Sequence, residues 1–195
     1  MYRITKFILA FLLILSSGKG CTYQEYSSVT RFNCYYQMQG RVVPGTPNIR
    51  MFVSHCNDYM FDDDKMAKAL SIFVHQYSEE FDIPTYRVWS LLHALRIEMS
   101  AVPRSVPAAF DINGKALRNV PVSGVALSKD WIWVEVKTKQ MWSSALAHEL
   151  VHIIIWRRNQ IHGDPDHEGK EWSGWTKKHT KLIKKFNKRL LELEI

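Results

Sequence analysis

The sequence lacks most features that mark specialised protein classes. It contains no internal repeat and no low-complexity segment, and only three of its 195 residues are cysteine. A repeat array and a disulfide-dense scaffold are therefore excluded. The remaining composition is that of an ordinary globular protein, and the length fits one medium domain with an appendage.

Long hydrophobic runs are also missing. The apolar run from Phe7 to Leu15 is too short to span a bilayer comfortably. Arg3 and Lys6 precede it and small residues follow it, as in a secretory signal. We therefore expect residues 1–20 to be a signal peptide and the protein to be exported to the periplasm or cell envelope. The alternative is that the segment is an uncleaved anchor.

The three cysteines leave two arrangements open. Cys21 follows the small residues, where a bacterial lipoprotein carries its lipidated cysteine, but Gly18-Lys19-Gly20 differs from the usual Leu-Ala-Gly of a lipobox. If Cys21 is lipidated and holds the protein at the membrane, Cys34 and Cys56 can form a disulfide. Otherwise Cys21 can pair with Cys34.

Acidic residues are absent from one basic stretch near the C-terminus. Leu182, Phe186 and Leu190 recur there at helical spacing, which predicts an amphipathic helix with a solvated basic face. Its cations are Lys177, Lys178, Lys181, Lys184, Lys185, Lys188 and Arg189. If this face has a partner, we expect anionic lipid headgroups. Nucleic acid is not expected, because export would separate the protein from it.

Periodicity along the chain predicts an α+β fold. We expect an extended N-terminal segment over residues 21–60 and a folded domain over residues 61–195. The domain is predicted to contain helices at 65–81, 88–95, 143–156 and 177–193 and strands at 96–99, 109–111, 120–127 and 131–136. In the last strand Ile132, Val134 and Val136 share one face, which should be core. We expect the tryptophans on its other face to pack under a neighbouring element.

The motif that carries chemistry is His148-Glu149-Leu150-Val151-His152. Residues four apart share a helix face, so His148 and His152 can hold one metal ion while Glu149 reaches a water on it. The surrounding segment Ser143 to Trp156 is strongly apolar and contains no proline or glycine. Burying these polar groups without partners would cost about 1 to 3 kcal/mol for each. A bound metal ion removes that cost.

A catalytic zinc ion normally has three protein ligands, so a third ligand is needed. The metzincin motif is excluded because Arg158 occupies the place of its third histidine. After a turn at Gly163, a short helix should return the chain toward the motif, and His167 in its first turn is the predicted third ligand. Glu171 is the alternative. Asp164 or Asp166 is a candidate partner for the second nitrogen of a ligating histidine.

The HELVH motif resembles the active-site helix of HExxH zinc metallopeptidases, and the GDPDH segment is similar to loops of small exported bacterial HExxH proteins. This resemblance implies a minimal zincin-like domain with a small antiparallel sheet, the HExxH helix and a long C-terminal helix. It further implies that Zn²⁺ is bound by His148, His152 and His167 and that Glu149 is the general base. The substrate would be a protein or peptide that pairs with the edge of the Trp131 to Val136 strand.

The sequence is also compatible with a second function, which involves zinc but no catalysis. A non-catalytic envelope lipoprotein could use zinc only to stabilise a binding or structural module. Glu149 favours the enzyme, because a structural site needs no general base and is usually closed by four ligands. Neither hypothesis identifies an oxyanion donor, for which His162 and His179 are candidates.

Overall fold

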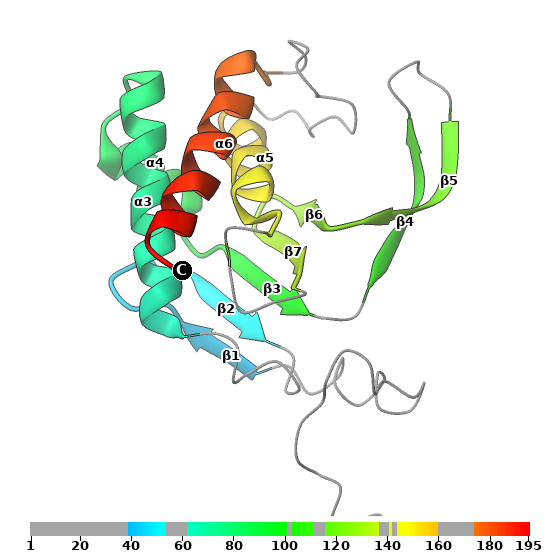
Figure 1. Cartoon of the computed structure of the whole chain (residues 1–195), viewed down its shortest axis with the longest axis horizontal. Helices are drawn as coiled ribbons and strands as arrows, with labels where there is room; N and C mark the ends of the chain where they lie inside the picture. The colour runs from blue at the N-terminus through cyan, green and yellow to red at the C-terminus, as the bar shows by residue number, and fades with distance from the viewer. Residues whose placement is uncertain are drawn as a thin grey trace, which may run out of the picture.

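The computed structural model describes residues 39–53, 62–100, 103–110, 116–136, 141, 144–159 and 174–195 (Figure 1). The predicted signal peptide, the cysteines and the segment containing His162, His167 and Glu171 lie outside these residues. The helices are α3 (Asp63–Phe81), α4 (Thr85–Leu92), α5 (Leu146–Asn159) and α6 (Lys177–Glu192). No helix within the described ranges is long and apolar enough to cross a membrane.

Five strands form the main sheet, in the order β1-β2-β3-β7-β6. These are β1 (Gln39–Val42), β2 (Arg50–Val53), β3 (Arg96–Ser100), β6 (Gly124–Ser128) and β7 (Trp131–Glu135). The pairs β2–β3 and β3–β7 are parallel, whereas β1 and β6 pair antiparallel at the two sides. The α+β class is thus confirmed. The main sheet is larger than the small antiparallel sheet predicted, and it is mixed, because α3 and α4 form a crossover between the parallel strands β2 and β3.

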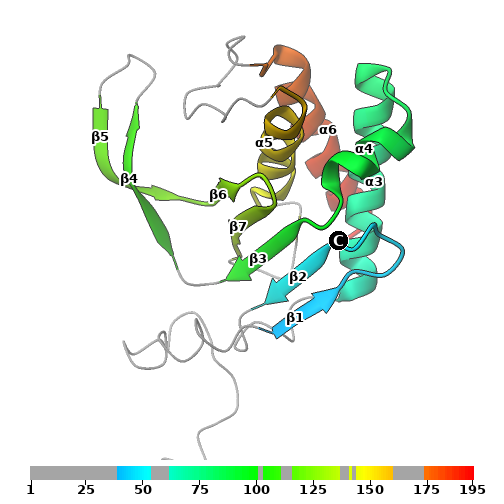
Figure 2. The ribbon, with the colours of Figure 1, turned by 180° about the vertical axis from the view of Figure 1, so that it is seen from behind.

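Two other boundaries differ from the sequence prediction. The strands β1 and β2 belong to the main sheet, so the folded region includes residues 39–53, which lie within the segment expected to precede the domain. The strand expected over residues 120–127 is interrupted at Ser123. Its first part is β5 (Ala116–Val122), which pairs with β4 (Arg104–Phe110) in a separate antiparallel sheet. This hairpin extends away from the helices (Figures 1 and 2).

The strand β7 is not at an edge of the sheet. It pairs with β3 on one side and with β6 on the other over nearly its whole length. The expected pairing of a substrate with the Trp131 to Val136 strand is therefore wrong, because that strand has no unpaired edge. The strand at the end of the sheet on this side is β6, which packs against α5.

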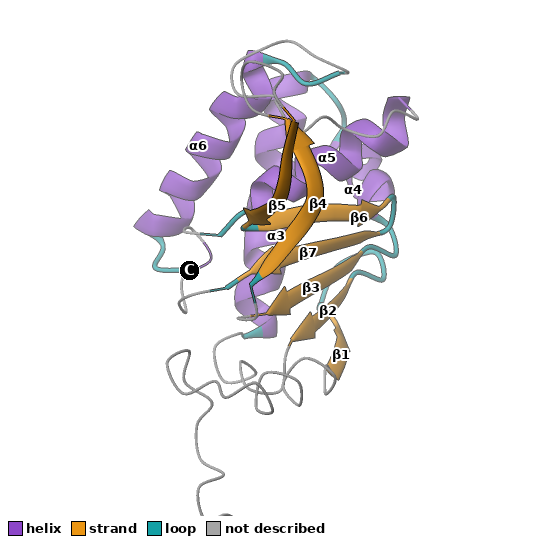
Figure 3. Cartoon of the chain, turned by 90° about the vertical axis from the view of Figure 1, so that its right-hand side faces the viewer, coloured by secondary structure: helices purple, strands orange, loops and turns teal. Residues whose placement is uncertain are grey.

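The hydrophobic core lies between the helices and one face of the main sheet, as the side view in Figure 3 shows. Ile132, Val134 and Val136 belong to this core, which confirms the alternation predicted for their strand. Trp133, on the opposite face, is fully buried, and the guanidinium carbon of Arg104 lies 5.2 Å from its ring centroid. That tryptophan thus packs under a neighbouring element, as expected.

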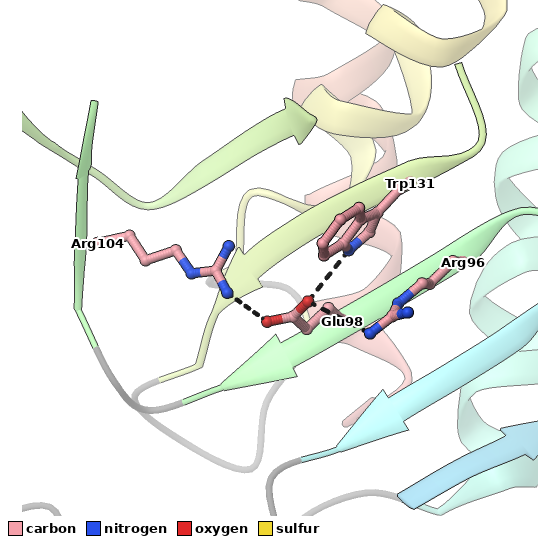
Figure 4. A network of polar contacts seen from close by, with 4 residues as sticks. All are labelled: Arg96, Glu98, Arg104 and Trp131. Carbon is pink, nitrogen blue, oxygen red and sulfur yellow. Dashed lines mark hydrogen bonds and ion pairs between the residues drawn. The ribbon is translucent and has the colours of Figure 1, made fainter. Parts of the chain in front are cut away.

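A buried carboxylate connects three strands on this opposite face (Figure 4). The Glu98 carboxylate of β3 accepts hydrogen bonds from Arg104 of β4 at 2.6 Å and from Trp131 Nε1 of β7 at 3.1 Å. Arg96 lies 3.9 Å from the same group. Because a buried charge needs such partners, this network fixes the first strand of the hairpin against the sheet.

Candidate metal and catalytic site

The helix α5 is a core helix that carries the ionisable side chains of the HELVH motif, His148, Glu149 and His152. It begins at Leu146, three residues later than predicted, where the Leu146 N–H donates to Ser144 Oγ at 3.3 Å. Its apolar residues are buried on several sides of the helix: Leu146, Ala147, Leu150, Val151, Ile153, Ile154 and Ile155. Such burial is typical of a helix inside a domain. The HELVH residues are therefore held in a rigid part of the molecule.

Arg157 fixes the C-terminal half of α5. Its guanidinium donates to three backbone carbonyls, those of Lys129 at 2.6 Å, Leu91 at 3.0 Å and His93 at 2.8 Å. These carbonyls lie in the turn between β6 and β7 and at the end of α4. One side chain thus joins α5 to two neighbouring loops.

His148 and His152 lie together on one face of α5. Their ring centroids are 5.0 Å apart, and both side chains are half-buried. Two imidazoles that each bind a tetrahedral zinc ion through one nitrogen, at about 2.0–2.1 Å, have centroids about 5 Å apart. The pair therefore fits a shared zinc ion in spacing and in donor type.

Glu149 points to the edge strand. Its side chain is only 3% exposed. Burial raises the pKa of Glu149 to about 8, against the opposing effect of a hydrogen bond from the Ala126 backbone in β6. At neutral pH such a carboxyl group is mostly protonated, and a cation bound beside it would lower this pKa and favour the carboxylate that a general base requires. The register of β6 shifts between Ala126 and Ser128, and such irregularities are common beside active sites.

Gly124 makes the close approach of β6 and α5 possible. A Cβ atom at this position would lie 2.5 Å from Glu149 Oε1 and 2.8 Å from Ala145 Cβ. Only glycine fits without displacing these groups. A glycine inside a predicted strand is a signal of such an approach, and it is the signal by which sequence reasoning could have placed this residue at the site.

Trp175 covers the histidine pair, and sequence reasoning missed it. Its ring centroid lies 5.1 Å from that of His148 and 5.0 Å from that of His152, and its side chain is buried. The indole Nε1 donates to Thr180 Oγ1 at 3.2 Å, which fixes the ring on the first turns of α6. No local pattern around this tryptophan distinguishes it from the other six in the chain.

His179 belongs to the framework behind Trp175. Its Nδ1 accepts from the Thr176 N–H at 3.0 Å, so a neutral ring carries its proton on Nε2, which lies 3.3 Å from Tyr77 Oη. Burial lowers the pKa of His179 to about 4, with a smaller contribution from Arg158. Both ring nitrogens are thus engaged, which argues against the suggested role of this histidine as an oxyanion donor.

The proposed third ligand remains a prediction. His167, Glu171, Asp164 and Asp166 all lie in residues 160–173, which are outside the described part of the chain. Within the described part, no group of three or more His, Cys, Asp or Glu residues could hold a metal ion. The structure places His148 and His152 side by side and Glu149, on the same helix, against β6.

Comparison of the chain with protein-family models, with curated protein sequences and with solved structures finds no match. The interpretation of this site therefore depends on its own residues.

The substitution Gly124→Ala should lower the free energy of unfolding by about 1–3 kcal/mol, because the added methyl group overpacks the contact between β6 and α5. Chemical denaturation measures this change. The cost should be smaller in a Glu149→Ala background, because Glu149 supplies two of the three nearest atoms. Equal costs in both backgrounds would show that the carboxylate does not occupy this space.

The substitution His179→Gln should reduce the loss of stability in acid. Between pH 6.5 and about 4 the unfolded chain binds a proton at His179 that the folded chain rejects, so the parent loses up to about 3 kcal/mol as the pH falls. Glutamine does not titrate and preserves the capping box with Thr176. Denaturation of both proteins at pH 7 and pH 4.5 tests this, and parallel losses would contradict the assigned burial of the neutral imidazole.

Proposed function

We propose that this chain is a zinc-dependent peptidase of the bacterial cell envelope, with a zincin-like domain. The observation that supports it best is the placement of three side chains on one helix. Two imidazoles lie at a spacing suited to one zinc ion, and the intervening Glu149 faces the edge strand β6. A chain that needed only a structural metal would gain nothing from a carboxyl group buried at this position.

Each residue of the candidate site would have a separate role in the proposed hydrolysis. His148 and His152 would hold the zinc ion, and His167 is the proposed third ligand. Zinc, when bound, would supply a Lewis acid and an activated water at neutral pH. Glu149 would accept a proton at its carboxylate and return it to the leaving amine. Arg157 and Trp175 would keep the helix and the imidazoles in position.

The edge strand supports a peptide as the substrate. An extended chain can add to an exposed strand through main-chain hydrogen bonds, which recognise the backbone and not one sequence. At β6 such a chain would lie beside the strand whose Ala126 backbone contacts Glu149. The proposed fold has the same relation, an antiparallel edge strand beside the HExxH helix. We extend the proposal to the envelope because of the N-terminal segment before Cys21.

The purified protein should contain about one zinc ion per chain. The double variant His148→Ala/His152→Ala should lose this zinc, because both proposed donors are removed. The matched variant His75→Ala/His93→Ala should keep it, since the side chains of these two histidines are exposed and lie outside the motif. Elemental analysis by mass spectrometry measures the content.

Measuring the zinc affinity of single variants then distinguishes between the two candidates for the third ligand, His167 and Glu171. His167→Ala should weaken binding and Glu171→Gln should not; the reverse result would assign Glu171. A correctly folded parent protein that binds no zinc would refute the metal site.

The substitution Glu149→Gln should retain zinc but reduce peptide hydrolysis about 10²–10⁴-fold, because the amide cannot accept the proton. Cleavage of a mixed peptide library, read by mass spectrometry, avoids choosing a substrate in advance. Glu135→Gln is the matched control, since Glu135 is also a buried glutamate but lies on β7. Equal cleavage by parent and Glu149→Gln would exclude this residue as the base. Zinc without any cleavage by the parent would favour the structural zinc module.

A further inference from the structure

The proposed peptidase activity makes no use of the basic face of α6. The predicted amphipathic helix is confirmed: Leu182, Phe186 and Leu190 are buried against the core. Every lysine and arginine of the helix is exposed. The helix thus packs through one side and presents a dense array of cations on the other.

The lysines fall into two groups, and Arg189 pairs with Glu192 at 3.1 Å. Lys178 and Lys185 lie beside α3, where Lys185 Nζ is 3.3 Å from Glu79 Oε2 and Lys178 Nζ donates to the Glu80 carbonyl at 3.4 Å. Lys177, Lys181 and Lys184 lie on another stripe, at spacings of four and three residues. No acidic side chain within the described residues forms an ion pair with these three.

The stripe continues to the end of the helix. Lys188 and Leu191 follow at the same helical spacing, and Leu191 is 51% exposed although it is a large apolar residue. Lys188 lies 4.0 Å from Glu192, an exposed pair that adds little stability. We call the surface formed by Lys177, Lys181, Lys184, Lys188 and Leu191 the lysine stripe.

The charges in the first turn of α6 are opposite to those that a helix N-terminus favours. This turn contains Lys177 and Lys178 and no acidic residue, although the positive end of a helix dipole favours negative charge there. Lys178 has a compensating contact in the Glu80 carbonyl, whereas none is evident for Lys177, and such departures from a local preference are expected at functional surfaces. A negatively charged partner would supply that compensation.

The chemistry of the stripe favours a lipid surface over nucleic acid. Lysine is a flexible point charge, which suits a fluid array of phosphates, whereas base recognition relies on planar donors such as arginine. The only phenylalanine of α6, Phe186, is buried, so the helix offers no aromatic side chain on which a base could stack. An exposed leucine in line with lysines suits the boundary between headgroups and acyl chains.

We propose that the lysine stripe is a docking surface for anionic phospholipid headgroups. This surface is independent of the proposed hydrolysis, so either can fail alone. Trp175, which contacts both imidazoles of the candidate metal site, directly precedes α6. Docking through the stripe would therefore place that site close to the membrane surface.

Vesicle cosedimentation of the full chain tests the proposal. Vesicles of phosphatidylcholine with about one third phosphatidylglycerol are compared with pure phosphatidylcholine, which reports binding that does not depend on charge. Each lysine near an anionic surface strengthens binding about five-fold, so Lys177→Gln/Lys181→Gln/Lys184→Gln should lose about a hundred-fold of the preference for anionic vesicles. The parent's preference should also fall as salt is added.

A matched variant controls for net charge. Lys65→Gln/Lys68→Gln/Arg87→Gln also removes three exposed cations, on α3 and α4, and should keep most of the preference. Equal losses in both variants would overturn the assignment to α6, as would unchanged binding in both. Duplex DNA is the second probe: if the α6 lysines are needed for DNA and not for vesicles, the surface is a nucleic-acid interface and the proposal is wrong.

Discussion

The contact between α5 and the edge strand β6 is the constraint on which the rest of the site depends. A carboxyl group, that of Glu149, is buried in this contact, and the strand can approach it only because Gly124 has no side chain. The backbone of Ala126, beside a register shift in the strand, makes a hydrogen bond to the same group. Burying a carboxyl group in this way costs stability, which the protein recovers through the apolar packing of the rest of α5. A position retained at such a cost is better explained by chemistry than by folding.

The sequence predicted the features that depend on residues close together in the chain. The spacing of His148 and His152 placed their rings on one face, and the alternation in Trp131 to Glu135 assigned its core side correctly. Pairing between strands cannot be predicted in this way, because the alternation of apolar residues in one strand does not identify the strands beside it. Sequence reasoning therefore missed the parallel pairs and took β7 for an edge strand. Trp175 was missed for the same reason, since its contact with the histidines depends on the return of α6 to α5.

The two zinc interpretations differ in what they explain. A structural ion would account for the imidazole pair and for Trp175 covering it, but it would leave the orientation of Glu149 toward β6 without a cause. A catalytic ion accounts for all three, because a base must lie beside both the metal and the strand where a peptide can add. Glu98 is also a buried glutamate, but it is not a second candidate for the general base. Its carboxylate is fully paired by Arg104 and Trp131 and lies on the opposite face of the sheet.

The first turn of α6 connects the candidate site to the lysine stripe. His179 caps this turn through Thr176 and lies against Phe81 and Trp175, while Trp175 lies on the histidine pair. One packed group therefore fixes both the helix axis and the Trp175 ring over the candidate metal site, so that neither can move without the other. If α6 lies on a membrane, the orientation of the site follows from the same contacts. A peptidase held in this way would meet peptide segments near the headgroups before those in bulk solvent, so its selectivity would come partly from position and not from a side-chain pocket.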